Sequence, residues 1–383
     1  MRILLFGNPS MWHSNLAKGL RERGHEVRLI SERYGWRKFP VDDICLERRT
    51  DINGKLALIE YLFKALPILR QCKGYDIVQL NHPMFLSLRG RHMKPFYNYI
   101  RRNNGKVVMC SVGEDYHVLD QIINKNILRY SEQRIGSEIM HNDNVQFLRK
   151  IYLEGHAANY CKYVAEDCDA IAAVLYEYWA CYNEVYPQKL HFFPLPVVIE
   201  EKDIREFSVG EKVRLFIGLQ RDRMNIKGTD IMLKAAQDIV RDYPEKATLQ
   251  VAENVPYAEY EQMLANADVL LDQLYSYTPA MNALLAMSKG IVAVTGGEPE
   301  NYDIIGEQEN YEILGEKELR PIVNVQPTYE SVYHELKELV LNKANVPELK
   351  RQSVEYVRRH HDYRKVAKQY EDFYKALQAN GVK

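Results

Sequence analysis

The stretch Leu215-Phe-Ile-Gly-Leu-Gln-Arg-Asp-Arg-Met-Asn-Ile-Lys-Gly-Thr-Asp230 is the most informative part of this sequence. The apolar run at 213–217 predicts a strand, Gly218 ends it, and a segment with helical periodicity begins at Thr229. The loop between strand and helix carries three positive charges and a second glycine, at Arg221, Arg223, Lys227 and Gly228. The pattern therefore predicts a cationic loop that joins a strand to a helix.

A loop of this kind is expected at the carboxyl edge of a parallel sheet, where doubly wound α/β domains bind their ligands. The N-terminus of the following helix adds backbone N–H donors. Arginine clamps phosphate oxygens with two N–H groups and lysine acts as a compact point charge, so the loop suits a phosphate or a diphosphate. The alternative is a solvated surface turn with ordinary charges.

The length and the composition narrow the class of protein. A chain of 383 residues exceeds the size at which one hydrophobic core usually keeps growing, so two domains are expected. The 51 basic and 52 acidic residues give a formal charge of −1, which excludes a general attraction to nucleic acid or to an anionic membrane. We expect no nucleic-acid partner.

The cysteines and the apolar segments indicate the compartment. The six cysteines include no C-x-x-C pair and have no accompanying histidine pattern, so we predict reduced thiols and no metal site. The apolar start at 1–6 is too short for a signal peptide, and no later run approaches the roughly 20 apolar residues of a membrane span. These features predict a cytoplasmic protein, soluble or peripheral at the inner membrane face.

The N-terminal segment has the pattern of a βαβ unit. A strand at 2–6 is followed by a glycine turn, a helix for which Ser14 is the expected N-cap, and a second strand at 25–30, so a parallel sheet is expected. The turn lacks a complete G-x-G-x-x-G, which disfavours a dinucleotide-dependent dehydrogenase. Asn8 and His13 are candidate contacts to an acceptor. The alternative for His13 is a partly exposed histidine near the start of the helix.

Two further strands are expected at 75–80 and 106–110. Polar residues and glycine follow each of them, at the place where an open parallel sheet presents its chemistry. The candidate site residues after these strands are His82, Gly113, Glu114, Asp115 and His117. We expect them on the side of the molecule that holds the acceptor.

The segment 87–106 is basic and aromatic. It carries six lysines and arginines and no acidic residue, with aromatic side chains between them. A segment of this kind can hold a protein on anionic lipid headgroups, which suggests a peripheral membrane contact here. The alternative is a basic, solvated helix on the flank of the sheet.

A domain boundary is expected near residue 198. Pro194 and Pro196 end regular structure, and the charged stretch 200–211 tolerates exposure to water. After it, strand and helix patterns alternate again as far as residue 294, so the second domain is also α/β. The predicted domains are therefore 1–198 and 199–355.

Several motifs of the second half occur in a characteristic order. They are the cationic loop at 218–228, the strand Asp268-Val-Leu-Leu271, the segment Ala286-Met-Ser-Lys-Gly290 with the apolar run after it, Gly296-Gly-Glu-Pro-Glu300, and His361-Asp362 ahead of a last helical pattern. With these motifs the chain resembles the retaining glycosyltransferases of the GT-B architecture, the broad group called family four. The resemblance covers nearly the whole length.

The resemblance implies a fold and an activity. The implied fold is α/β, with two Rossmann-like domains facing across a cleft and a C-terminal helical segment, 356–383, that crosses back to the first domain. The implied activity is transfer of a sugar from a nucleotide-diphosphate sugar, with retention, onto a saccharide or lipid-linked acceptor held by the first domain. The donor is a substrate, so no cofactor is expected, and cations take the place of a metal.

The resemblance also assigns roles within the second domain. The loop at 218–228 is similar to the one that grips the donor diphosphate, so Arg223 and Lys227 are the expected catalytic residues, with Arg221 as an alternative to Arg223. A leaving diphosphate gains negative charge, which fixed cations stabilise. The expected donor contacts are Gly218, Arg221, Gly228, Thr278, Met281, Asn282, Glu298 and Glu300.

Two departures from the family pattern concern the site. The family's paired glutamates fall on Tyr277 and Leu285, and the histidine often found before G-x-D falls on Val112. We therefore expect a different or weaker ribose contact, with Glu298 or Glu300 as a substitute. Two other functions stay open: a nucleotide-sugar epimerase of the same shape, which needs acid and base groups, and a non-catalytic nucleotide or sugar binder.

Overall fold

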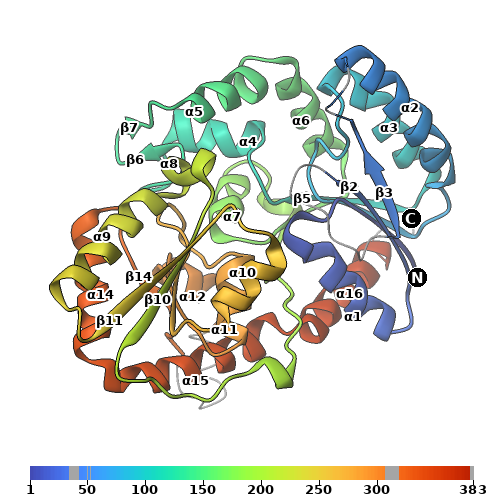
Figure 1. The fold of residues 1–383 in the computed structure, drawn as a ribbon. Helices are drawn as coiled ribbons and strands as arrows, with labels where there is room; N and C mark the ends of the chain where they lie inside the picture. Colours follow the sequence, from blue (N-terminus) through green and yellow to red (C-terminus); the bar gives the residue numbers. More distant parts are fainter. Residues whose placement is uncertain (34–42, 50, 52, 307–318, 380–383) are drawn as a thin grey trace. The chain divides into compact units, whose positions relative to one another are not determined.

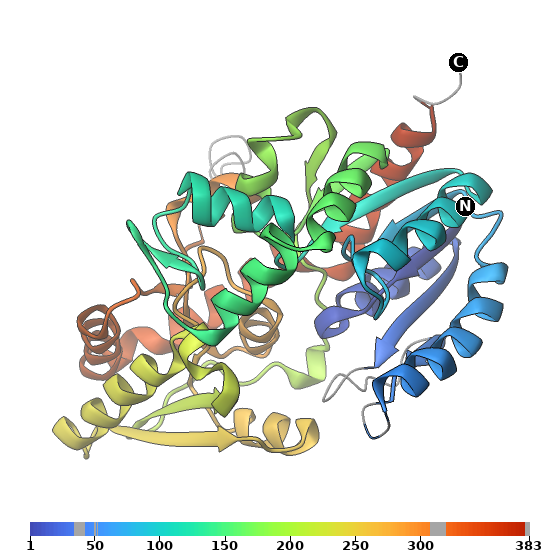
Figure 2. The same ribbon diagram turned by 90° about the horizontal axis from the view of Figure 1, so that it is seen from above.

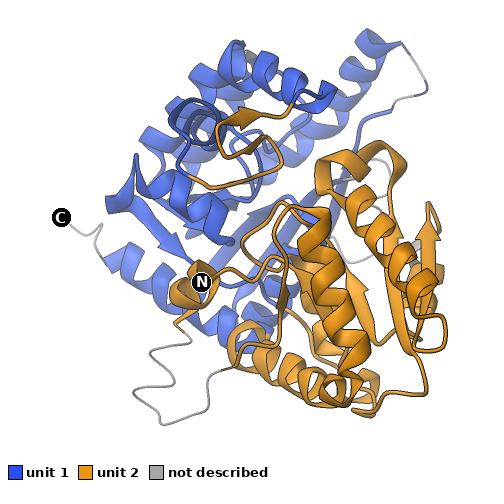
Figure 3. Cartoon of the chain, turned by 90° about the vertical axis from the view of Figure 1, so that its left-hand side faces the viewer, with its two compact units in different colours: residues 1–127, 141–196, 363–383 blue, residues 128–140, 197–362 orange. Residues whose placement is uncertain are grey.

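The computed structural model describes residues 1–33, 43–49, 51, 53–306 and 319–379. The chain divides into two compact units, which Figure 3 shows in different colours: unit 1 comprises residues 1–127, 141–196 and 363–383, and unit 2 comprises residues 128–140 and 197–362. Each unit has its own parallel sheet, so the predicted α/β fold class is confirmed. Residues 128–140, which the predicted division placed in the first domain, group with unit 2.

Within the described residues, the sheet of unit 1 has seven parallel strands in the order β3-β2-β1-β4-β5-β8-β9; Figure 1 labels β2, β3 and β5. The strands are β1 (Arg2–Phe6), β2 (Glu26–Arg33), β3 (Ile44–Glu47), β4 (Ile77–Leu80), β5 (Lys106–Ser111), β8 (Ala170–Ala173) and β9 (Leu190–Phe192). Strand β1 lies between β2 and β4, so the strand order reverses at β1, which is a topological switch point. Ligands of such sheets bind beside this reversal, at the carboxyl ends of the strands.

The helices of unit 1 cover both faces of this sheet. They are α1 (Trp12–Glu22), α2 (Gly54–Gln71), α3 (Gly90–Asn103), α4 (Tyr116–Leu119), α5 (Asp143–Leu148), α6 (His156–Asp167), α7 (Tyr176–Asn183) and α16 (Tyr363–Ala379). In Figure 1, α1 and α16 lie on one face and α2 and α3 on the other. The central strands are apolar and fully buried, as expected for parallel strands covered on both faces.

The sheet of unit 2 has five parallel strands in the order β11-β10-β12-β13-β14. Its strands are β10 (Val213–Leu219), β11 (Ala247–Glu253), β12 (Val269–Leu271), β13 (Val292–Thr295) and β14 (Val323–Asn324). Its helices are α8 (Met224–Lys227), α9 (Thr229–Asp242), α10 (Tyr257–Leu264), α11 (Met281–Ser288), α12 (Pro299–Ile305), α14 (Tyr329–Leu341) and α15 (Val346–Tyr356). The strand predicted at 213–217 is confirmed and extends two residues further.

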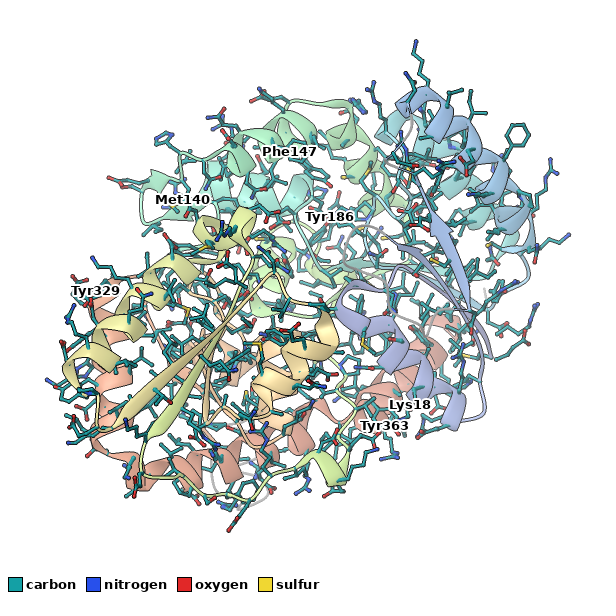
Figure 4. All side chains as sticks on the ribbon, in the orientation of Figure 1. Lys18, Met140, Phe147, Tyr186, Tyr329 and Tyr363 are labelled. Atoms are coloured by element: carbon teal, nitrogen blue, oxygen red, sulfur yellow. The ribbon has the colours of Figure 1, made fainter. Side chains whose placement is uncertain are left out.

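The segment 128–140 forms a small antiparallel hairpin, with strands β6 (Arg134–Ile135) and β7 (Glu138–Ile139). Ile135 and Met140, the latter labelled in Figure 4, pack against the apolar core of unit 2. The hairpin belongs to unit 2 because its apolar side chains are buried there. The sequence carried no motif in this region, and the hairpin was not predicted.

The C-terminal helix α16 packs on α1, which confirms the predicted return of the chain to the first domain. The two helices approach closely at Gly19, where a Cβ atom would lie 2.6 Å from the Cβ of Ala367. The hydroxyl of Tyr363 donates to Glu22 Oε1 at 2.7 Å, and the ammonium of Lys18 lies over the Tyr363 ring, as Figure 4 shows. Only glycine at position 19 permits this distance between the helices.

A buried ion pair fixes α15 to the sheet of unit 2. Lys350 and Asp268 are 2% and 0% exposed, and Lys350 Nζ lies 2.6 Å from Asp268 Oδ1. The ammonium also donates to the carbonyl of Ser208 at 2.7 Å, and the guanidinium of Arg214 donates twice to Asp268 at 2.9 Å. Each buried charge therefore has hydrogen-bonding partners, which offsets the cost of removing it from water.

Lys350→Met is expected to reduce the free energy of unfolding by about 3 kcal/mol, because Asp268 would keep its charge in a buried place with one cation fewer. Urea denaturation measures the change. Arg351→Met is the matched control on the same helix, since Arg351 pairs with Glu348 at the surface, and we expect a change below about 0.5 kcal/mol. Equal effects of the two substitutions would contradict a structural role for the buried pair.

Candidate functional site

The carboxyl edge of the unit 2 sheet brings together the predicted donor residues. Strand β10 pairs with β11 on one side and β12 on the other, so the strand order reverses at β10. The loops after β10, β12 and β13 all leave the sheet at this edge because the strands are parallel. Ligands of open α/β sheets bind at such a reversal. The predicted donor residues lie on these three loops and on the starts of the helices that follow them.

The loop after β10 depends on its two predicted glycines. Gly228 has a φ of +69°, which favours glycine, and a Cβ there would lie 2.9 Å from the side chain of Leu274. A Cβ at Gly218 would lie 2.6 Å from the ring of Tyr260. The N–H of Leu274 donates to the carbonyl of Lys227 at 2.9 Å, which joins the loop after β12 to the loop after β10.

The three cations of this loop are in different situations. The guanidinium of Arg221 is 76% exposed and forms an ion pair with Glu253. The side chains of Arg223 and Lys227 are partly buried and form no hydrogen bond or ion pair within the part of the chain that the structure describes. Two positive charges at the carboxyl edge of the sheet therefore have no partner among the described residues.

The helix α11 begins at the same edge. Its N-cap residue, Ala280, provides no side-chain acceptor, so its first N–H groups are not capped by that side chain. Thr278 is buried just before the helix, and Met281 is the first helical residue. Asn282 donates to Asp272 Oδ1 at 2.8 Å and accepts from the hydroxyl of Tyr260 at 2.9 Å. Asn282 therefore braces the loop, while the helix N-terminus offers the donors.

Glu298 is the most heavily hydrogen-bonded carboxylate of the site. It is 4% exposed. Its Oε1 accepts from the hydroxyl of Tyr130 at 2.8 Å, from Asn324 Nδ2 at 3.0 Å and from Gln326 Nε2 at 2.5 Å. Its Oε2 accepts from Arg129 at 2.8 Å. A ribose hydroxyl could reach Glu298 only by displacing one of these donors.

Arg129 joins Glu298 to Glu300. Its guanidinium donates to both oxygens of Glu300, from Nη1 to Oε1 and from Nη2 to Oε2. Burial raises the pKa of Glu300, but the hydrogen bond and the positive charge of Arg129, together with a backbone hydrogen bond, outweigh burial and hold the pKa below its usual value. The Glu300 hydrogen bond in turn raises the pKa of Arg129. Glu300 and Arg129 are therefore charged at neutral pH, and the Arg129 guanidinium bonds to both Glu298 and Glu300.

Tyr277 stands where the resembling family has a glutamate. It is buried, its ring stacks on Tyr130 with centroids 4.8 Å apart, and its hydroxyl accepts from the backbone N–H of Arg129 at 2.7 Å. The Arg129 guanidinium lies over the ring at 4.9 Å. Burial raises the pKa of Tyr277 to about 12, so its hydroxyl stays neutral at physiological pH. Leu285 is half-buried on α11, which leaves both positions without a carboxylate.

The sequence reasoning missed the residues that surround Glu298, namely Arg129, Tyr130, Asn324 and Gln326. The hairpin segment carries no motif, and β14 is only two residues long. One signal was present: two carboxylates, Glu298 and Glu300, in a loop expected to bind an anion require a compensating cation. Two adjacent carboxylates therefore indicate a nearby cation, but they do not show which residue supplies it.

His13, a predicted acceptor contact, lies in the core of unit 1. It is fully buried, and its Nδ1 lies 2.6 Å from the carbonyl of Gly7, so Nδ1 carries the proton. Nε2 accepts from the amide of Gln79 at 3.0 Å, and Gln79 Oε1 accepts from the hydroxyl of Tyr374 at 2.7 Å. Both ring nitrogens are occupied, so neither faces an acceptor. The expected partial exposure of His13 is wrong as well.

Asn8 caps the first helix. Its Oδ1 accepts from the backbone N–H of Ser14 at 3.1 Å, although the two residues are not at the usual capping distance in sequence. Ser14 itself lies inside α1, which begins at Trp12, so the prediction of Ser14 as N-cap is wrong. The reason is that the helix begins two residues earlier, directly after Ser10 and Met11, whose φ values of +51° and +64° are not helical.

The remaining acceptor candidates lie after β4 and β5, and the structure brings two of them into contact. His82 Nε2 donates to the carbonyl of Glu114 at 3.1 Å. A Cβ atom added at Gly113 would lie 3.9 Å from Cδ2 of His82. Asp115 is the N-cap of α4: its Oδ1 accepts from Val118 N at 3.0 Å, and its Oδ2 accepts from the hydroxyl of Tyr182. Asp115 therefore has a structural role.

His117 is buried among tyrosine rings. Its ring lies 5.1 to 5.4 Å from the rings of Tyr116, Tyr182 and Tyr186, and its Nε2 has no hydrogen-bond partner. Burial lowers the pKa of His117, and it also lowers that of His82. Both imidazoles are therefore neutral at physiological pH. No group of three or more His, Cys, Asp or Glu side chains within the described ranges is placed to hold a metal ion.

The environment of His13 predicts a dependence of stability on pH. Burial lowers the pKa of His13 from its usual 6.5 to about 4, so the unfolded chain takes up a proton that the folded chain excludes. Stability is therefore expected to fall as the pH falls from 6.5 towards 4. His13→Gln removes this loss, which amounts to about 2 kcal/mol between pH 6.5 and pH 5.

Urea denaturation at pH 7 and pH 5 measures this difference. His141→Gln is the control, because His141 is exposed in the same unit. The two variants are expected to differ in how much stability they lose on acidification. Identical losses in the wild type and in His13→Gln would contradict the buried, neutral state of His13.

Comparisons with known proteins agree on the fold. No protein-family model matches the sequence, and no curated protein matches it either. Solved structures do match. Sucrose-phosphate synthase from Thermosynechococcus elongatus is 14% identical, with 99% of each chain covered and a TM-score of 0.58. HepE from Anabaena, in complex with UDP and glucose, is 11% identical, with 98% of this chain and 100% of that chain covered and a TM-score of 0.58.

The same fold occurs in a candidate UDP-N-acetylglucosamine 2-epimerase from Listeria monocytogenes. It is 10% identical, with 96% of this chain and 94% of that chain covered and a TM-score of 0.51. Identities this low establish a common architecture and leave the activity open. Across its whole length, this chain shares the GT-B fold of the family-four glycosyltransferases.

Proposed function

We propose that this chain, which has the GT-B fold, transfers a sugar from a nucleoside-diphosphate sugar, with retention, onto a saccharide or lipid-linked acceptor held by unit 1. One observation carries the proposal. Arg223 and Lys227 have no partner among the described residues, and they lie on the loop at the sheet reversal where such folds bind ligands. Unpaired cations at this place favour an anionic ligand with adjacent phosphates.

The chemistry follows from where charge develops. The bond between the sugar C1 and the diphosphate oxygen breaks, the ring becomes oxocarbenium-like, and the diphosphate gains negative charge. Arg223, Lys227 and the N–H groups at the start of α11 stabilise that charge. The acceptor hydroxyl attacks C1 from the side of the departing diphosphate and gives its proton to a diphosphate oxygen. No dedicated carboxylate pair is required, which fits Tyr277 and Leu285.

The ribose contact is assigned to Glu300. Glu298 already accepts from four protein donors, whereas the Glu300 side chain is 24% exposed and is bonded by the Arg129 guanidinium. Arg129 holds Glu300 ionised and therefore ready to accept hydrogen bonds from a sugar diol. HepE, with UDP and glucose bound in the same fold, supports a nucleotide at this edge.

Lys227→Ala and Arg223→Ala are each expected to weaken nucleoside-diphosphate binding tenfold to a hundredfold, because each removes charged hydrogen bonds worth about 1.5–3 kcal/mol. Sugar transfer should fall at least as much. Calorimetry with the nucleoside diphosphate that binds the wild type most tightly provides the measurement. Arg221→Ala is the matched control: its guanidinium is paired with Glu253 at the surface, so we expect a change below about threefold.

An equal loss in all three variants would contradict the assignment of Arg223 and Lys227, and so would no loss in any of them. Diphosphate binding that depends on both residues, without any transfer or hydrolysis, would instead identify the chain as a nucleotide-sugar binder. Tyr277 and Leu285 are the residues that favour this second function.

The side chains of Tyr277 and Glu298 disfavour an epimerase. Epimerisation needs side chains that take and give protons near the sugar, whereas the hydroxyl of Tyr277 is neutral and Glu298 is saturated with donors. We expect a nucleotide sugar incubated with the protein alone to keep its ring configuration. Proton NMR of that mixture gives the result. An epimer that accumulates without an acceptor would overturn the transferase proposal.

A further inference from the structure

The helix α2 has two apolar faces. Ala57, Tyr61, Ala65 and Leu69, each four residues apart, are buried against unit 1. The other face carries large apolar side chains in contact with water: Leu56, Ile59, Phe63 and Leu66 are 60%, 52%, 75% and 42% exposed. At 100° per residue these four lie within about 80° of the helix circumference, opposite the buried face.

This exposed stripe is not explained by the fold of unit 1. A surface helix of a soluble protein normally has one apolar face, and a helix that is apolar on two sides is normally covered on both. Within the described ranges, six large apolar side chains are strongly exposed, and four of the six lie on this stripe. Contiguous exposed apolar surface indicates a place where another surface binds.

The charge around the stripe indicates what binds there. Residues 48–106 contain twelve lysines and arginines and three acidic residues, a formal charge of +9 in a chain whose total is −1. Lys55, Lys64 and Arg70 are exposed on α2 itself, and Glu60 is paired with Lys64. The hydroxyl of Tyr99 donates to the carbonyl of Arg70 at 3.1 Å, which places the basic helix α3 beside α2.

The stripe is accessible in unit 1. Figures 1 and 2 show α2 along the outer margin of that unit. Part of the charge of α3 is internally compensated, because Arg101 pairs with Asp167 and Asp169. Arg89, Lys94 and Arg102 remain exposed on this helix. No helix of the described ranges has both the length and the apolar character needed to cross a bilayer.

We propose that the exposed face of α2 docks on an anionic lipid surface. Leu56, Ile59, Phe63 and Leu66 enter the boundary between headgroups and acyl chains, and the lysines and arginines of α2 and α3 contact the lipid phosphates. The apolar anchor is therefore α2, and the basic segment 87–106 supplies attraction. A second copy of the chain fits the stripe poorly, because the exposed lysines and arginines around it would face the same positive charges of the other copy.

The experiment measures flotation of the full chain with vesicles of phosphatidylcholine, alone or mixed with phosphatidylglycerol. We expect the wild type to float with the mixed vesicles and to be released by salt. Phe63→Ser is expected to lower the vesicle partition coefficient at least tenfold, because it removes the most exposed apolar side chain of the stripe. Lys55→Gln combined with Arg70→Gln should lower binding and weaken its dependence on salt.

Phe147→Ser is the matched control. Phe147 is 60% exposed on α5, apart from α2 in the same unit (Figure 4), and its loss should change vesicle binding less than twofold. A melting temperature equal to that of the wild type shows that each serine variant retains its fold. Three results would overturn the proposal: no flotation of the wild type with anionic vesicles, equal flotation of the two serine variants, or concentration-dependent dimers that Phe63→Ser abolishes in the absence of lipid.

Discussion

The order of the strands in unit 2 determines where positive charge can stay unpaired. Because β11 and β12 flank β10, the loop after β10 and its cations lie where the strand order reverses. The exposed guanidinium of Arg221 forms an ion pair with Glu253, whereas the side chains of Arg223 and Lys227 form no ion pair in the described part of the chain. In the proposed function, these two cations are neutralised by the diphosphate of the donor. The same edge also carries the uncapped start of α11.

The second feature of the site is the cation that the hairpin segment contributes. Two carboxylates as close as Glu298 and Glu300 would repel each other and oppose an anionic ligand. Arg129 removes the repulsion by bonding to both, and Tyr130 stacks on Tyr277 while donating to Glu298. In the proposed function, Glu300 then remains as a carboxylate for the ribose, although Tyr277 and Leu285 stand where the resembling family has its paired glutamates. The residues that achieve this come from residues 128–140, far from the rest of unit 2 in sequence.

The alternation of strand and helix patterns predicted most of the fold. The strand after Lys212, the glycine at position 228 and the helix from Thr229 are where local periodicity and glycine placed them, because each depends on residues close together in the chain. The short strands β3 and β14 were missed, since runs of four and two residues carry too little pattern. His13 was misjudged because its burial results from α16, whose Tyr374 reaches Gln79 from almost 300 residues away.

The affinity for a nucleoside diphosphate compared with the monophosphate of the same base tests the central claim most directly. Calorimetry at two salt concentrations gives both values for each base. If Arg223, Lys227 and the start of α11 hold a diphosphate, the diphosphate should bind more than tenfold tighter, and the advantage should shrink as salt rises. Equal affinities of the two nucleotides, unaffected by salt, would contradict it.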